Sequence, residues 1–168
     1  ERAAGIFDRA VMHVPIGGGS TTGLGKAIAL DSGLPILAIP TTYAGSEMTT
    51  IYGITEGGQK KTGRDPRVLP RTVIYDPLLT LSLPVSLSIT SGINAMAHAA
   101  ECLYAVDGNP IMDLQSEEGI AALGKALPLI HKDPSSFKDV YGGAGDNVAV
   151  ECMRIYPAGT QADSVVIF

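Results

Sequence analysis

The feature that most constrains this chain is a glycine-rich junction, "HVPIGGGSTTGLGKA" at residues 13–27. Its three consecutive glycines let the backbone turn sharply and approach another molecule, because glycine has no Cβ. If a helix follows, the backbone N–H groups at its start lie at the positive end of the helix dipole, where an anion is favoured. The junction therefore predicts either a phosphate-binding turn or a turn that only connects a strand to a helix.

The segments on either side of the glycines predict a β-α-β unit. Residues 9–16 are a mostly apolar run with valines, which is typical of one buried parallel strand. From Ser20 to Gly33 the spacing is helical, and the expected apolar stripe of this helix consists of Leu24, Ala27, Ile28 and Leu30. A second apolar run at residues 34–40 completes the unit with a right-handed crossover. This order of elements indicates an α/β fold.

The next part of the chain mixes short strands with turns before it becomes helical. We predict strands at residues 49–55 and 71–77, with turn-forming residues at 56–70 and a hairpin in this region. Residues 85–105 and 111–132 then carry apolar residues at helical spacing, which predicts two helices of comparable length. The final residues lose this periodicity and contain no recognisable motif.

Composition excludes several classes of function. Twelve Lys and Arg against seventeen Asp and Glu give a net charge of −5, which argues against nucleic acid or an anionic membrane as the main partner. No apolar run reaches the roughly 18 residues of a membrane helix, and the first residues lack the pattern of a signal peptide, so we expect a cytoplasmic protein. Two cysteines, Cys102 and Cys152, are too few for a disulfide scaffold and are expected to be reduced thiols.

Two common phosphate-binding motifs do not describe the glycine junction. The Walker pattern needs Ser or Thr after Gly-Lys, whereas Gly25-Lys26 is followed by Ala27. The G-x-G-x-x-G fingerprint is usually accompanied by an acidic residue about 20 residues further on, and none closes the second strand here. By spacing alone, both interpretations of the junction remain open.

Four segments, taken together and in order, resemble the maleylacetate reductases, a metal-independent branch of the iron-containing alcohol dehydrogenase superfamily. They are "GGGSTTGLGKAIAL", "LAIPTTYAGSEMTTIYGITE", "KKTGRDPRVLPRTVIYDP" and "SGINAMAHAAECLYA". The resemblance implies the dehydroquinate synthase-like fold, an α/β architecture in which a Rossmann-like nucleotide-binding domain precedes an α-helical domain. It also implies an oxidoreductase that uses NADH or NADPH to reduce maleylacetate, a small dicarboxylate, to 3-oxoadipate during degradation of aromatic compounds. A homodimer is a further expectation of the family.

The resemblance assigns cofactor-binding roles to two stretches of the chain. The pyrophosphate is expected on Gly18, Gly19 and Ser20, and the wall of the cofactor site on Thr41, Thr42, Tyr43 and Ser46. Compact hydroxyl groups on a loop after a strand suit this task, since each can donate and accept hydrogen bonds. Ordinary capping or turn bonding is the alternative role for the two threonines.

The resemblance also directs attention to His98 and Asn94, which share one helix face because they stand four residues apart. Metal-dependent members of the superfamily place an aspartate at the position of Asn94 and a ligating histidine at that of His98. An amide is a weaker ligand for a divalent cation, so no metal is expected here. His98 is then expected to donate to the substrate ketone oxygen as the enolate forms, or to protonate the adjacent carbon. A core histidine bonded to a backbone carbonyl is the alternative.

A basic segment is the candidate for holding the dianionic substrate. Residues 60–71 contain five basic side chains against Asp65 alone. The planar fork of arginine suits a carboxylate, which makes Arg64 or Arg67 the candidate clamp, with Arg64 our choice. A solvated basic loop without a binding role is the alternative.

The chain departs from the family in two places. A helix and a strand that the family has before the glycine loop are missing between Ile16 and Gly17, so residues 9–16 have to take the place of the lost strand. The resemblance also stops near Phe137, before most of the helical domain. We therefore predict three parts: a partial dinucleotide-binding α/β domain at 1–83, the first helices of an α-helical domain at 84–138, and a divergent tail at 139–168.

Three hypotheses about function follow from these observations. The first is a reductase of the maleylacetate type, either active in shortened form or a piece of the active enzyme. The second is a non-catalytic remnant that binds nucleotide weakly or associates with itself through an exposed sheet edge. The third is a metal-dependent alcohol dehydrogenase of the same superfamily. The choice between NADH and NADPH stays open, because the strand end that would discriminate them is not recognisable.

Overall fold

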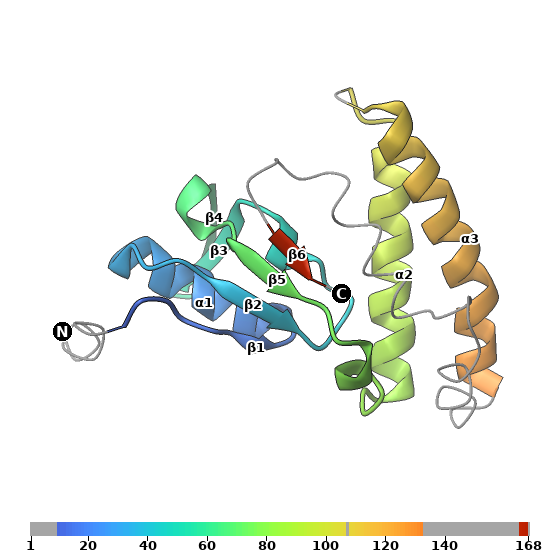
Figure 1. The fold of residues 1–168 in the computed structure, drawn as a ribbon, viewed down its shortest axis with the longest axis horizontal. Coiled ribbons are helices and arrows are strands. Elements are labelled where there is room, and N and C mark those ends of the chain that lie inside the picture. The colour runs from blue at the N-terminus through green and yellow to red at the C-terminus, as the bar shows by residue number, and fades with distance from the viewer. Residues whose placement is uncertain (1–9, 107, 133–164, 168) are drawn as a thin grey trace. The chain divides into compact units, whose positions relative to one another are not determined.

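The computed structural model describes residues 10–106, 108–132 and 165–167 (Figure 1). The chain divides into two compact units. Within the described residues, the first unit consists of 10–40, 46–75 and 165–167, and the second of 41–45, 76–106 and 108–132. The predicted domain boundary at residue 83 and the predicted tail from 139 stay predictions; residues 133–164 lie outside the described part of the chain.

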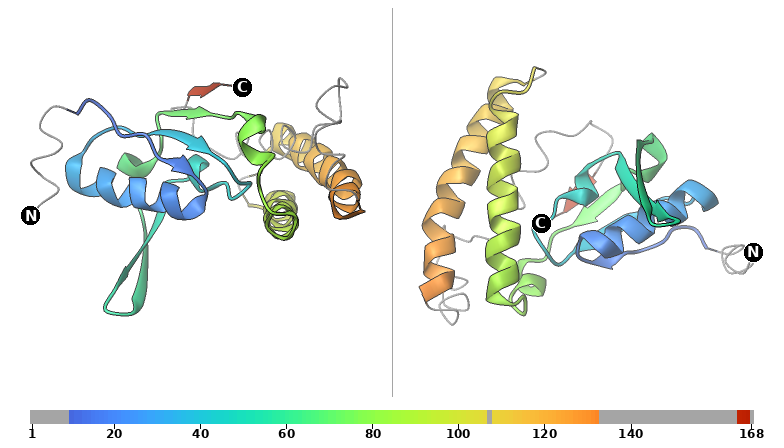
Figure 2. Two further views of the ribbon diagram at one scale, coloured as in Figure 1. Left: turned by 90° about the horizontal axis from the view of Figure 1, so that it is seen from below. Right: turned by 180° about the vertical axis from the view of Figure 1, so that it is seen from behind.

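The first unit is built on a four-stranded parallel sheet. Its strands are β1 (Ile16–Gly17), β2 (Leu37–Pro40), β5 (Thr72–Ile74) and β6 (Val165–Ile167), in the order β1-β2-β5-β6. Helix α1 (Gly19–Ser32) connects β1 to β2 and lies along one face of the sheet (Figure 2). The predicted β-α-β unit and the α/β class are confirmed.

Residues before the glycine turn run beside β2, but not as a buried strand. The His13 carbonyl accepts from Leu37 N at 3.1 Å and the Pro15 carbonyl from Ile39 N at 3.0 Å, so the segment is extended from His13 onward. The predicted burial is wrong, because β1 ends the row of described strands and pairs on one side only. Apolar side chains of this segment are exposed as a result: Val11, Met12, Val14 and Ile16.

Helix α1 buries a different face from the one its sequence predicts. Leu24, expected in the apolar stripe, is 63% exposed. The buried residues are instead Thr22, Gly25, Lys26 and Ala29. A Cβ atom on Gly25 would lie 2.9 Å from Pro15 Cγ, so the helix approaches the preceding segment too closely for a larger residue. Small and polar residues face the sheet for this reason.

A hairpin follows β2 within the first unit. Strands β3 (Ile51–Glu56) and β4 (Gln59–Arg64) pair antiparallel, and Gly57 and Gly58 both have positive φ at the two-residue turn between them. Figure 2 shows the hairpin extending away from the parallel sheet. The hairpin is confirmed, but the prediction that 56–70 consists of turns is wrong for β4. Short helices η2 (Ser46–Met48) and η3 (Pro66–Val68) flank the hairpin.

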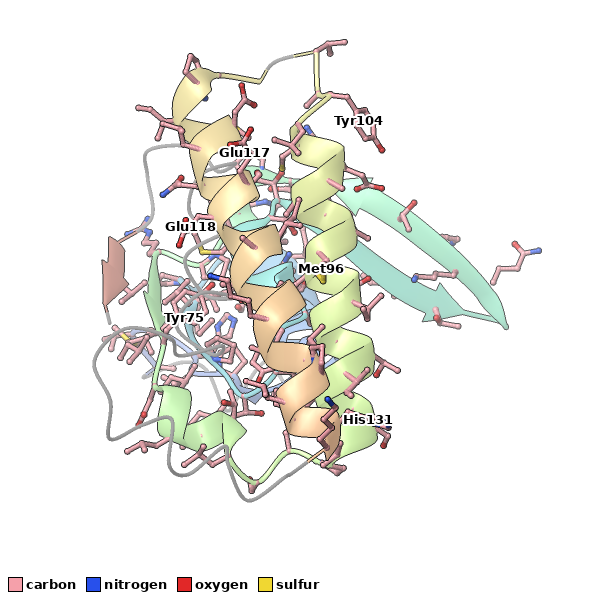
Figure 3. All side chains as sticks on the ribbon, turned by 90° about the vertical axis from the view of Figure 1, so that its right-hand side faces the viewer. Tyr75, Met96, Tyr104, Glu117, Glu118 and His131 are labelled. Atoms are coloured by element: carbon pink, nitrogen blue, oxygen red, sulfur yellow. The ribbon has the colours of Figure 1, made fainter. Side chains whose placement is uncertain are left out.

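The second unit is a helical hairpin, and both predicted helices are confirmed. After η4 (Pro77–Thr80), helices α2 (Val85–Cys102) and α3 (Pro110–Lys132) lie side by side, with Met96 of α2 next to α3 (Figure 3). A Cβ atom on Gly92 would lie 2.6 Å from Leu127 Cδ2, which shows how closely the helices pack. The buried core comprises Tyr43, Ala95, Ala99, Leu123, Ala126, Leu127 and Ile130. No helix in the described residues is long and apolar enough to cross a membrane.

Candidate functional site

The glycine turn leaves the start of α1 open to a ligand. Gly18 is the N-cap in an extended conformation, no side chain caps the helix, and its first turn carries no acidic residue. The first intrahelical bond runs from Thr22 N to the Gly18 carbonyl at 3.1 Å, so the N–H groups of the preceding residues have no partner within the helix. Gly18 and Gly19 are half-buried and Ser20 is exposed. This arrangement favours an anion at the predicted phosphate-binding residues.

Gly17 has a packing role that the sequence analysis did not assign. A Cβ atom at this position would lie 2.5 Å from Thr21 Oγ1, and its φ is +152°. Any larger residue would push against the first turn of α1. Gly17 therefore allows β1 to pass directly into the helix whose N–H groups form the candidate site.

The predicted cofactor wall is divided between the two units. Thr41 and Thr42 are half-buried in the second unit, where the Tyr43 backbone N–H donates to Ser91 Oγ at 3.1 Å. The side chain of Tyr43 belongs to the helix-pair core rather than to an open surface. Ser46 begins η2 in the first unit, and its carbonyl accepts from the Thr49 hydroxyl at 3.2 Å. The structure thus places Ser46 with the glycine turn in one unit, and the role of all four residues stays a prediction.

His98 lies on α2 with a carboxylate as its neighbour. Its side chain is 47% exposed, and Nδ1 is 3.2 Å from Glu101 Oε2, one helical turn further on. Asn94 is also exposed and lies one turn earlier. His98 is thus not a buried core histidine. Glu101 is a candidate site residue that the sequence analysis missed, although its i,i+3 spacing from His98 was a usable signal.

The two candidate arginines have different surroundings. The Arg67 guanidinium donates to Asp65 Oδ2 at 2.7 Å and to the Leu30 carbonyl at the end of α1 at 3.2 Å. The hydrogen bonds from the Arg67 side chain and backbone lower the pKa of the Asp65 carboxyl. Arg64, the last residue of β4, is exposed, and its side chain makes no hydrogen bond or ion pair with the described residues. Arg64 is therefore the more available of the two for a substrate carboxylate.

A buried polar cluster in the first unit was missed by the sequence analysis. Lys26 is fully buried, and its ammonium donates to the Thr49 carbonyl at 2.7 Å, to Thr49 Oγ1 at 3.0 Å and to the Ile51 carbonyl at 2.6 Å. Burial lowers the pKa of Lys26 to about 8, while the charge of Glu47 acts in the opposite direction.

Glu47 and Tyr75 complete this polar cluster. Glu47 is 2% exposed and accepts a hydrogen bond at 2.9 Å from the hydroxyl of Tyr75, which is also buried. Burial raises the pKa of Glu47, although its hydrogen bonds lower it. One signal for the cluster was present in the sequence: Lys26 shares a helix face with Thr22 and Ala29, through i,i+4 and i,i+3 spacing.

Potential metal ligands do not gather in the described part of the chain. No group of three His, Cys, Asp or Glu side chains there could hold an ion. His13 Nε2 donates to the Gly25 carbonyl at 2.8 Å, which is a structural contact with α1. Cys102 is a free thiol, and Cys152 lies outside the described residues. The metal-free reaction stays a prediction.

Part of the chain matches a family model. Residues 8–77 match the family model of the iron-containing alcohol dehydrogenases. The chain is also similar in sequence to maleylacetate reductases. It is 61% identical over 155 residues to the maleylacetate reductase of Burkholderia cepacia, covering 80% of this chain and 44% of that protein.

Solved structures agree with this assignment. Maleylacetate reductase from Agrobacterium tumefaciens superposes with a TM-score of 0.73 at 50% identity, covering 94% of this chain and 41% of that one. Sulfoacetaldehyde reductase from Bifidobacterium kashiwanohense, solved with NAD⁺, superposes with a TM-score of 0.76 at 26% identity, covering 94% and 46%. The predicted fold family is confirmed.

The chain spans less than half the length of the curated reductases that it matches. The matched region also contains a gap. The alignment with the Burkholderia cepacia protein is 155 positions long but covers only 80% of the 168 residues of this chain. Some aligned positions of that protein therefore have no counterpart in this chain. The loss of a segment directly before the glycine turn stays a prediction.

Proposed function

We propose that this chain serves in the NADH- or NADPH-dependent reduction of maleylacetate to 3-oxoadipate, either as a shortened reductase or as a piece of one. The observation that carries this proposal is the uncapped start of α1 at Gly18, in a chain 61% identical to a maleylacetate reductase. A helix start with free N–H groups and no nearby carboxylate fits a pyrophosphate. The NAD⁺ bound to the sulfoacetaldehyde reductase supports the same class of cofactor.

The nicotinamide cofactor would supply a hydride to the carbon–carbon double bond of the substrate. Negative charge then develops on the ketone oxygen, and a positioned donor stabilises it. His98 is the proposed donor, because its exposed imidazole lies beside the Glu101 carboxylate and can hold and pass on a proton. The same imidazole is the proposed donor to the adjacent carbon.

Arg64 is the proposed clamp for a carboxylate of the dianion. Its side chain is exposed and uncommitted among the described residues, whereas Arg67 is held by Asp65 and Leu30. A guanidinium can bind a carboxylate through two parallel hydrogen bonds. A small dicarboxylate is therefore the proposed substrate class.

We propose no metal for this reaction, since Asn94 offers a neutral amide where a ligand carboxylate would be needed. Three curated relatives, at 61%, 54% and 53% identity, are named maleylacetate reductase, which favours this reaction over that of a metal-dependent alcohol dehydrogenase or a non-catalytic remnant. A homodimer and a cytoplasmic location remain proposals from the family resemblance.

Titration with NADH tests whether the uncapped start of α1 binds a nucleotide. The chain contains no tryptophan, so the emission of NADH can be followed without protein background at the same wavelengths. Gly17→Ala, which places a Cβ against Thr21, is expected to weaken binding about tenfold or more, as a displaced first turn loses hydrogen bonds to phosphate. Gly23→Ala is the matched control, because nothing lies within 4 Å of its Cβ position.

Loss of NADH absorbance on addition of maleylacetate then tests the reaction, with a chelator-treated sample to test for a metal. Turnover that survives chelation is expected. Absence of NADH and NADPH binding in the wild type would overturn the nucleotide site, and turnover abolished by chelation and restored by a divalent cation would overturn the metal-free assignment.

A further inference from the structure

Lys26 joins the helix of the glycine turn to the segment that contains Ser46. All three ammonium protons of Lys26 are used, two on Thr49 and one on the Ile51 carbonyl. The side chain is fully buried, so if the amine is lost no water takes its place as the donor to these acceptors. The contact therefore fixes the backbone between η2 and β3 against α1.

The connection continues from Thr49 to Ser46. The Thr49 hydroxyl accepts from Lys26 and donates to the Ser46 carbonyl at 3.2 Å, and Thr49 N–H reaches the same carbonyl at 3.3 Å. Glu47, next in the chain, is anchored separately by Tyr75 on the other side. Hydrogen bonds thus run without interruption from the third turn of α1 to Ser46, all within the first unit.

We propose that Lys26 is a positioning residue, whose ammonium sets the distance between the glycine turn at the start of α1 and Ser46 at the start of η2. This proposal rests on the proposed nucleotide site. Lys26 touches no cofactor itself. Its effect is confined to ligands long enough to reach both places, because Gly17 of the glycine turn packs against Thr21 independently of the ammonium contacts.

Two ligands separate this role from a general loss of stability. ADP presents a pyrophosphate for the glycine turn, whereas NADH extends beyond it. Lys26→Met keeps the length and apolar stem of the side chain but removes the ammonium. The expected result is a Kd for NADH raised about tenfold, with the Kd for ADP changed less than about twofold.

Hydrogen exchange provides a measurement that does not depend on nucleotide binding. In the ligand-free protein, Lys26→Met is expected to speed exchange of the amides of residues 46–51 about tenfold relative to the rest of the sheet. Ala29→Gly is the matched control, since it destabilises the same buried face of α1 without touching the ammonium contacts. Thr49→Val is a milder second variant, which removes one acceptor of Lys26 and the hydroxyl bond to Ser46.

The outcomes separate the two proposals. Equal weakening of ADP and NADH by Lys26→Met, or the same exchange pattern in Ala29→Gly, would overturn the positioning role. If the wild type binds neither nucleotide, the proposed function fails, while faster exchange limited to residues 46–51 would still support the link from Lys26 to Ser46. If Lys26→Met does not fold, Thr49→Val provides the test. Unchanged NADH binding and unchanged hydrogen exchange in Thr49→Val would then overturn the positioning role of Lys26.

Discussion

Replacing the buried Lys26 by methionine tests how desolvation acts on the stability of the first unit. Burial lowers the pKa of Lys26 from 10.5 to about 8, against the opposing effect of Glu47. A shift of this size corresponds to about 3 kcal/mol. Between pH 8 and 10.5 the unfolded chain keeps a proton on this lysine that the folded chain releases. The resulting penalty on folding is fully present below pH 8 and is relieved as the pH rises toward 10.5.

Urea unfolding followed by circular dichroism, at closely spaced pH values across this window, measures the effect. The unfolding free energy of the wild type minus that of Lys26→Met should rise with pH by about 3 kcal/mol. Glu47, whose raised pKa acts with the opposite sign, is present in both proteins, but its charge interaction with Lys26 is lost in the variant and is therefore part of the measured difference. If the difference in unfolding free energy stays constant or falls between pH 8 and 10.5, the claim that burial destabilises the charged form of Lys26 is refuted.

Three further predictions concern the glycine turn, the helical hairpin and His98. Gly17→Ala should lower the unfolding free energy by about 1–3 kcal/mol through its contact with Thr21, while Gly23→Ala should raise it by up to about 1 kcal/mol, as measured by urea unfolding. Leu127→Ala should lower it by about 2–5 kcal/mol, because Leu127 is 5% exposed in the α2–α3 core; a loss well below 1 kcal/mol would argue against that core. His98→Gln should reduce kcat about a hundredfold with NADH affinity unchanged, because the proposed proton donor is lost; an unaltered kcat would exclude the role.

The sequence was sufficient to predict the elements whose signals are local. The glycine turn, the two long helices and the β-α-β order all follow from spacing and turn chemistry, and each is present in the structure. Strand β4 was missed because "QKKTGR" lacks apolar residues, and its pairing depends on the Gly57-Gly58 turn and on β3. The exposure of β1 was missed because it depends on which strands neighbour it. Neither property is contained in the segment itself.

The candidate site was predicted unevenly for a related reason. Gly18, Gly19 and Ser20 are consecutive, so one local turn brings them together. The partners of Lys26 lie more than twenty residues away in Thr49 and Ile51, and a lysine in a helix is ordinarily solvated. Its burial becomes predictable only when the facing carbonyls are known.

Hydrogen bonds to carbonyl groups help to hold helix α1 in place. Directly after β1, the helix approaches the preceding segment closely at Gly25, which leaves no room there for a larger residue. The contacts that hold it are polar: His13 donates to the Gly25 carbonyl, Lys26 to Thr49 and Ile51, and Arg67 to the Leu30 carbonyl near the helix end. Because hydrogen bonds are directional, these contacts restrict sliding of α1 along its axis as well as its separation from the neighbouring segments. A stripe of leucine side chains would restrict sliding less. With Leu24 exposed and Lys26 buried, polar contacts hold this face of α1 in place of the predicted apolar stripe.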